Sequence, residues 1–116
     1  MMHNFKNLKI WQKSRELVKR VFLLTKEFPA EEKYGLVSQM LRSAYSIPSN
    51  IAEGSGRASD KEFIRFLDIA LGSAFELETQ LILASDINYL PDEELKEVQA
   101  SVQEIQKMIY SFKMNL

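Results

Sequence analysis

Three glutamates are the side chains of this sequence best suited to acid–base or metal chemistry: Glu53, Glu76 and Glu78. Glu78 is the most unusual of them, because a helical wheel places it near the middle of an apolar arc that includes Ala74 and Leu81. A carboxylate in such a position must be paired, hydrogen-bonded or protonated. It could act as a general base or a metal ligand, but structural ion-pair networks perturb carboxylates as well, and we favour a structural role.

Other chemistry finds little support in the sequence. There is no cysteine, and the only histidine is His3, whereas a di-iron bundle needs a Glu-x-x-His pair on each of two helices. The motifs HExxH, GxSxG, GxGxxG and GxxxxGK[ST] are absent. The run Gly54-Ser55-Gly56 lacks the lysine of a phosphate loop, so it indicates a turn. We therefore expect no catalytic residue, no metal ligand, no cofactor and no small-molecule substrate.

Basic residues gather near the start of the chain. Residues 1–29 carry seven Lys or Arg and two Glu. On a helix, one flank would present the candidate nucleic-acid-binding residues Lys6, Lys9, Lys13 and Arg20, and a second row would present Arg15, Lys19 and Lys26. An ordinary solvated face explains the pattern more simply, since Glu16 interrupts the first row. Assembly would change this, because repeated copies of the helix could form a ring of positive charge.

Four segments repeat their apolar residues with a helical period, and none alternates as a strand would. They predict helices over about residues 8–27, 31–53, 60–87 and 92–113. Phe28-Pro29 would end the first helix, and Ser59 with Glu62 forms a capping box at the start of the third. Short connections make neighbouring helices antiparallel. The expected fold is all-α, an antiparallel up-down four-helix bundle in one domain over residues 1–116.

The second predicted helix has two unusual features. Pro48 lies in its interior, and because the apolar phase continues beyond it we predict a kinked helix rather than two short ones. Either Gly54 or Gly56 could adopt a left-handed conformation at its end. The face opposite the core is almost uncharged, which favours packing against another subunit over an exposed polar surface. This face carries Gln39, Arg42, Ser46, Ser49 and Asn50.

Length and composition limit the functional classes. The chain has 116 residues and a formal net charge of −1, so it offers no strong overall field to nucleic acid or to a membrane. No apolar run reaches the length of a membrane span, and the first residues do not form a signal peptide. Together with the lack of cysteine, these features predict a cytoplasmic protein without a membrane partner.

Several segments resemble a known bacterial family. The most specific is SIPSNIAEGSGR at residues 46–57, and further matching runs are FKNLKIWQKSREL at 5–17, YGLVSQMLRSA at 34–44, FIRFL at 63–67 and GSAFELETQ at 72–80. The sequence is similar to the four-helix bundle proteins encoded in intervening sequences of bacterial 23S rRNA genes, often labelled a ribosomal protein family.

The resemblance implies a ring-shaped homopentamer without enzyme activity. Relatives that serve diversity-generating retroelements are basic and are thought to bind nucleic acid and a reverse transcriptase, whereas this chain has a net charge of −1. Pro48 and Gly54 are carried over by motif. So are the residues that we interpret as a structural polar network: Arg42, Ser46, Asn50, Glu53, Glu76 and Glu78. Arg42 and Asn50 are the expected partners of Glu78 by residue type.

Three functional hypotheses follow. The first is a non-enzymatic oligomer that associates with RNA or with a nucleic-acid-processing protein through its basic first helix. The second is a protein-interaction scaffold with no nucleic-acid role, which the near-neutral charge favours. The third, a hydrolase or metalloenzyme, depends only on Glu53, Glu76 and Glu78, and we rank it last.

Overall fold

The computed structural model describes residues 3–116, and its main elements are four long helices. These are α1 (Lys9–Thr25), α2 (Leu36–Ser55), α3 (Asp60–Asp86) and α4 (Asp92–Met114). Short 3-10 turns, η1 (Phe5–Asn7) and η2 (Ala30–Glu32), precede α1 and α2. No strand occurs among the described residues. The predicted all-α four-helix bundle is confirmed.

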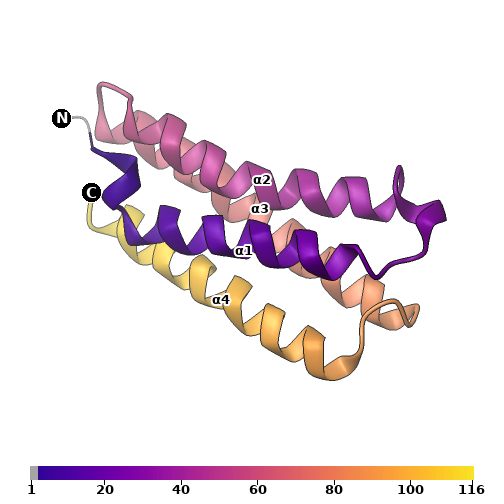
Figure 1. The fold of residues 1–116 in the computed structure, drawn as a ribbon. Helices are drawn as coiled ribbons and strands as arrows, with labels where there is room; N and C mark the ends of the chain where they lie inside the picture. Colours follow the sequence, from indigo (N-terminus) through magenta and orange to yellow (C-terminus); the bar gives the residue numbers. More distant parts are fainter. Residues whose placement is uncertain (1–2) are drawn as a thin grey trace.

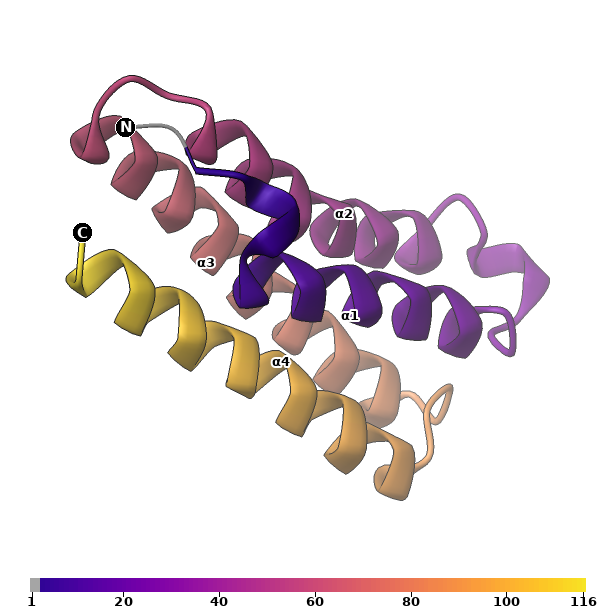
Figure 2. The same cartoon turned by 60° about the vertical axis from the view of Figure 1, so that its left-hand side comes forward.

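The helices run up and down in chain order around one core (Figure 1). Each helix packs against the next, and α1 also packs against α4, which closes the bundle (Figure 2). The molecule is elongated, 45 × 24 × 19 Å, and the first and last of the described residues lie at the same end of it. The apolar stripes predicted from the sequence fill the core. Its largest fully buried side chains include Phe63, Met40, Ile47, Leu67, Leu81 and Ile109.

Among the four long helices, only α3 begins with a side-chain cap. The amide of Glu62 donates to Ser59 Oγ at 3.2 Å, so the serine half of the predicted capping box forms and α3 begins directly after it. The predicted start of the second helix near residue 31 was wrong. Residues 30–32 form a separate 3-10 turn, and α2 begins only after Gly35, whose backbone angles are not helical. The short turn reflects the preceding Pro29, which holds the chain extended there.

Helix α2 continues through Pro48 to Ser55 as one helix, in agreement with the prediction that the chain does not split into two helices there. The way in which α2 ends differs from expectation. Neither Gly54 nor Gly56 takes the left-handed conformation predicted for a cap, since no glycine has a positive φ among the described residues. Gly54 instead lies buried inside the last turn, where α2 and α3 approach closely. A Cβ atom at this position would lie 2.7 Å from Phe66 Cβ and 2.8 Å from Phe63 Cδ1.

Candidate functional site

The basic row Lys6, Lys9, Lys13 and Arg20 does not form a free cationic stripe. Two of its members pair with acids of α4: Arg20 Nη2 lies 2.9 Å from Glu97 Oε2, and Lys13 Nζ lies 3.6 Å from Glu104 Oε1. Lys6 and Lys9 are exposed, and they lie beyond these pairs at the start of α1. Lys13 and Arg20 therefore lie at the seam between α1 and α4, and these two of the four cations are already paired.

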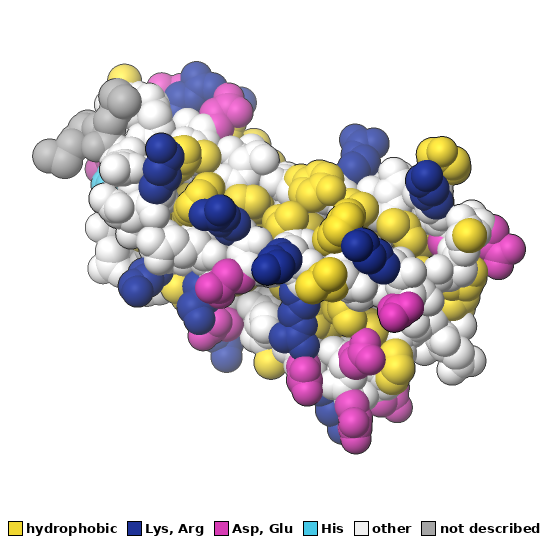
Figure 3. All heavy atoms as spheres, in the orientation of Figure 1, with side chains coloured by type: hydrophobic (Ala, Val, Ile, Leu, Met, Phe, Trp, Pro, Cys, Tyr) yellow, Lys and Arg dark blue, Asp and Glu magenta, His cyan; other side chains and the backbone are white. Residues whose placement is uncertain are grey.

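Two members of the second basic row, Arg15 and Lys26, border a groove between α1 and α2, whereas Lys19 does not line it. The Arg15 guanidinium lies 5.5 Å from the centroid of the Trp11 ring, and Lys26 Nζ lies 4.8 Å from that of Phe22. Both contacts are of the cation–π type and keep the charges at the rim of the aromatic surface. Figure 3 shows a dark-blue row along α1 beside a yellow apolar band that extends toward α2.

The groove consists of two hollows of about 450 Å³ and about 420 Å³, which meet at Tyr45. Its walls are mostly apolar, and three large rings are strongly exposed, Phe22 by 44%, Tyr45 by 47% and Tyr34 by 88%. Four cations and no acid line the two hollows: Arg15, Lys26, Lys33 and Arg42. An open apolar surface with a uniformly positive rim is suited to binding an acidic, partly apolar partner.

This groove was not predicted from the sequence. Its signal was present, since Leu41, Tyr45, Pro48 and Ala52 are spaced by four, three and four residues and so form a second apolar stripe on α2. The predicted uncharged outer face of α2 was only partly right. Ser46 and Asn50 are half-buried toward α3 rather than turned to solvent.

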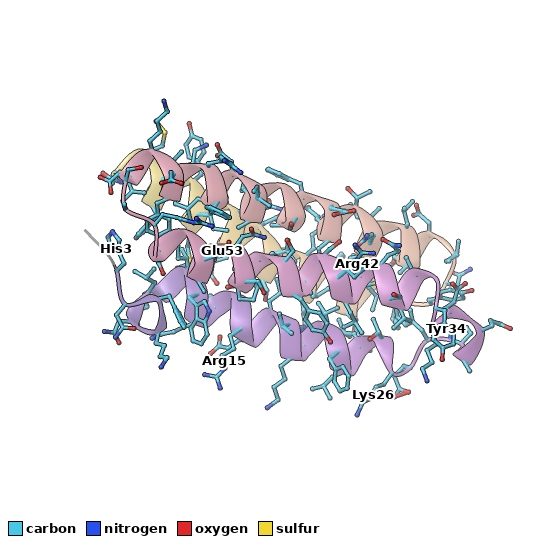
Figure 4. All side chains as sticks on the ribbon, turned by 90° about the horizontal axis from the view of Figure 1, so that it is seen from above. His3, Arg15, Lys26, Tyr34, Arg42 and Glu53 are labelled. Atoms are coloured by element: carbon cyan, nitrogen blue, oxygen red, sulfur yellow. The ribbon has the colours of Figure 1, made fainter. Side chains whose placement is uncertain are left out.

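The predicted polar network divides into separate clusters. Ser46 Oγ and Ser73 Oγ share a hydrogen bond of 2.7 Å between α2 and α3, and Asn50 Nδ2 donates to Ser46 O at 2.8 Å and to Ser46 Oγ at 2.9 Å. Glu53 pairs instead with Arg57 one turn later, at 2.7 Å. Figure 4 shows Arg42 and Glu53 well apart along α2. The six residues therefore do not form one network.

Arg42 and Glu76 lie near the serine cluster. Both line a hollow of about 230 Å³ between α2 and α3, together with Gln39, Ser43, Ser46 and Ser73. No ion pair joins Arg42 to Glu76 among residues 3–116, and both side chains belong to exposed residues. The hollow is polar and open, with no histidine or cysteine in its walls.

Glu78 has partners that the sequence analysis did not predict. Neither Arg42 nor Asn50 reaches it. Three glutamines of α4 donate to its carboxylate instead: Gln106 at 2.8 Å, Gln99 at 2.8 Å and Gln103 at 2.9 Å. Burial alone would raise the pKa of Glu78, but the hydrogen bonds from Gln106, Gln99 and Gln103 outweigh it, and the pKa lies below its ordinary value. An ionised carboxylate held by three amides links α3 to α4, and it is poorly suited to act as a base.

The described residues contain neither a cluster of metal ligands nor a membrane-spanning helix. In the part of the chain from His3 onward, no three His, Cys, Asp or Glu side chains gather closely enough to hold a metal ion. The His3 ring packs on aromatic neighbours, 5.1 Å from the centroid of Phe63 and 6.1 Å from that of Phe112. Within residues 3–116, every helix is too short or too polar to cross a bilayer.

Comparison with known proteins identifies a family and similar solved structures. The family described as 23S rRNA-intervening sequence protein matches residues 6–111. A crystal structure of a protein of unknown function from the S23 ribosomal protein family of Bacteroides thetaiotaomicron is similar throughout, with a TM-score of 0.84 and 33% sequence identity. The similarity covers 90% of this chain and 95% of that one. Comparison with curated proteins finds no match.

Proposed function

This chain belongs to the 23S rRNA-intervening sequence protein family, and we propose that it works as a non-enzymatic, homo-oligomeric assembly module. The observation that carries the proposal is the open apolar groove between α1 and α2, with its rim of four cations. A small domain gains stability when such a surface is covered, because burial of apolar area is the main favourable term in association. The similarity to the intervening-sequence family supports a ring of five copies.

The carboxylates support the non-enzymatic part of this proposal. Glu53 is paired with Arg57, and Glu78 accepts three hydrogen bonds from glutamines, so both have structural partners. Glu76 lies in an open polar hollow without a nucleophile-and-base pair beside it. The surfaces rather than these carboxylates are therefore the functional part of the molecule. A cytoplasmic location stays a prediction.

The mass in solution tests the assembly. We expect multi-angle light scattering at micromolar concentration to give a multiple of the 13.4 kDa protomer mass, with five as the number implied by the family resemblance. The measured mass should fall only when the protein concentration is diluted below the dissociation constant of the oligomer, because association follows mass action. A single species of 13.4 kDa across the micromolar range would refute the proposal.

A second candidate function is RNA association through the start of α1. It is favoured by a wide hollow lined by Lys6, Trp11, Arg15 and Lys19, which combines cations with an aromatic ring. Glu16 also lines it, so the field is positive but not uniform. Nucleic-acid phosphates would meet these cations, and the aromatic ring could stack on an unpaired base.

Charge reversal tests the RNA candidate. In fluorescence anisotropy at low salt, the change of both Lys6 and Lys19 to Glu should weaken binding of single-stranded RNA by roughly tenfold or more, since each phosphate contact releases a counterion. Lys96→Glu, on the exposed face of α4, is the matched control and should change binding little. Absence of binding at low salt, or an equal loss in the control, would count against an RNA role.

A further inference from the structure

Besides the groove, the protomer leaves a second apolar surface uncovered, along the outer face of α3. Four large side chains on this helix are strongly exposed: Ile69 by 42%, Phe75 by 53%, Ile82 by 38% and Leu83 by 50%. Gly72 lies one helical turn from both Ile69 and Phe75, and Ile82 lies two turns beyond Phe75, so these residues are spread over the outer face of α3. Several exposed apolar residues on one helix face mark an interaction surface more clearly than a single one does.

The charges of the two surfaces are complementary. The groove is lined by four cations and no acid, as described above. The α3 surface has the opposite character, since no Lys or Arg occurs between residues 66 and 95, whereas Glu76 and Asp86 are exposed on α3. Asp68 is exposed as well, but it is already paired with Lys113 of α4. Complementary charge favours a particular pairing of surfaces and disfavours each surface pairing with itself.

Gly72 supplies an independent indication that something approaches α3 closely. It lies in the middle of a 27-residue helix, where glycine is among the least favourable residues. At position 54, packing within the protomer explains why the residue is glycine, because a Cβ there would collide with Phe63 and Phe66. A Cβ at position 72 would have no neighbour within 4 Å, so nothing in the protomer requires glycine there. A missing side chain at an exposed position allows another backbone or a bulky side chain to come close.

We propose that the outer face of α3, centred on Gly72, docks into the α1/α2 groove of a second copy of this chain. The inference rests on the assembly function proposed above and assigns its interface. Each copy carries both surfaces, so one type of contact covers the groove and the α3 face of every subunit in a closed ring. The contact is heterologous, which generates rings or filaments rather than a simple two-fold dimer. In this contact the exposed apolar side chains of α3 cover the apolar walls of the groove, and the exposed carboxylates of α3 lie near the cations of its rim.

Light scattering of three lysine variants tests the interface. Gly72→Lys adds a long cation to the α3 face, and Ser49→Lys adds one to the exposed floor of the groove. Both should reduce the oligomer to the 13.4 kDa protomer at concentrations where the unmodified chain is assembled. Ala100→Lys, on the exposed face of α4, is the matched control and should stay assembled. Circular dichroism should show that all three variants keep their helix content, because each change lies at an exposed position.

The outcomes separate this inference from the proposed function. If the unmodified chain assembles and Gly72→Lys assembles equally well, the interface lies elsewhere and only the inference fails. The same conclusion follows if Ala100→Lys dissociates the oligomer as strongly as Gly72→Lys does. If the unmodified chain is itself a 13.4 kDa monomer, the proposed assembly and the interface both fail.

Discussion

Replacement of Gly54 with alanine should destabilise the protein by about 1–3 kcal/mol, the usual cost of overpacking a filled core. The added methyl group would lie 2.7 Å from Phe66 Cβ and 2.8 Å from Phe63 Cδ1, and 3.3 Å from the Phe63 carbonyl oxygen. Two of these atoms are near or on the backbone of α3, so the helices must separate to make room. Alanine favours the helix over glycine by about 1 kcal/mol, but the upper part of the range expected for the overpacking cost is larger than this gain. Urea unfolding followed by circular dichroism measures the change.

Gly56 provides the matched control for this substitution. It follows α2 directly, its φ of −90° suits any residue, and a Cβ there would be 3.7 Å from the nearest atom, the Glu53 carbonyl oxygen. Gly56→Ala should therefore be neutral or stabilise the fold by up to about 1 kcal/mol, because it restricts the unfolded chain. If Gly54→Ala and Gly56→Ala lost equal amounts of unfolding free energy, the close approach of α2 and α3 at Gly54 would not be the cause of the destabilisation.

Replacement of Glu78 with alanine should destabilise the bundle by about 2–4 kcal/mol at neutral pH, since hydrogen bonds to a charged group contribute about 1.5–3 kcal/mol each and water replaces some of them. The carboxylate is the shared acceptor for Gln99, Gln103 and Gln106. Gln106 is 9% exposed, so its amide would lose its partner with little access to water. Glu16→Ala, on the exposed face of α1, is the control and should change stability by less than about 0.5 kcal/mol.

The contribution of Glu78 should also depend on pH in a definite direction. Its pKa in the folded protein lies below the ordinary value of 4.5, so folding favours the ionised form. The contribution is complete above pH 4.5 and is lost as the pH falls through the lower folded-state pKa. The difference in unfolding free energy between the unmodified chain and Glu78→Gln should therefore shrink in acid. A difference that grew as the pH fell below 4.5 would contradict the hydrogen-bonded arrangement.

The sequence predicts this fold well because its local and periodic signals agree. In α4, Val98, Val102, Ile105 and Ile109 are buried at the positions that the three-and-four spacing indicated. Ser59 accepts the Glu62 amide and fixes the start of α3. These signals need only neighbouring residues along one helix, so they can be recognised without knowing how the helices meet.

The partners of the polar side chains were not predictable in the same way. A helical wheel shows that Glu78 lies at an apolar arc, but it does not show which helix supplies the partner. The partners are three glutamines of α4, and which side chains can reach Glu78 depends on the rotation of α3 against α4. The partners of the basic residues on α1 were unpredictable for a similar reason, since Arg20 and Lys13 pair with Glu97 and Glu104 of another helix, α4.

Site-directed cross-linking tests most directly whether two different faces meet between copies. The chain has no cysteine, so Ser49→Cys and Gly72→Cys can be combined without other reactive thiols. With a short bis-maleimide, the double variant should give a ladder of cross-linked copies that extends beyond the dimer, whereas each single variant should give almost none. A ladder that stops at the dimer, or an equal ladder when Ala100→Cys replaces Gly72→Cys, would contradict assembly of the α3 face into the α1/α2 groove.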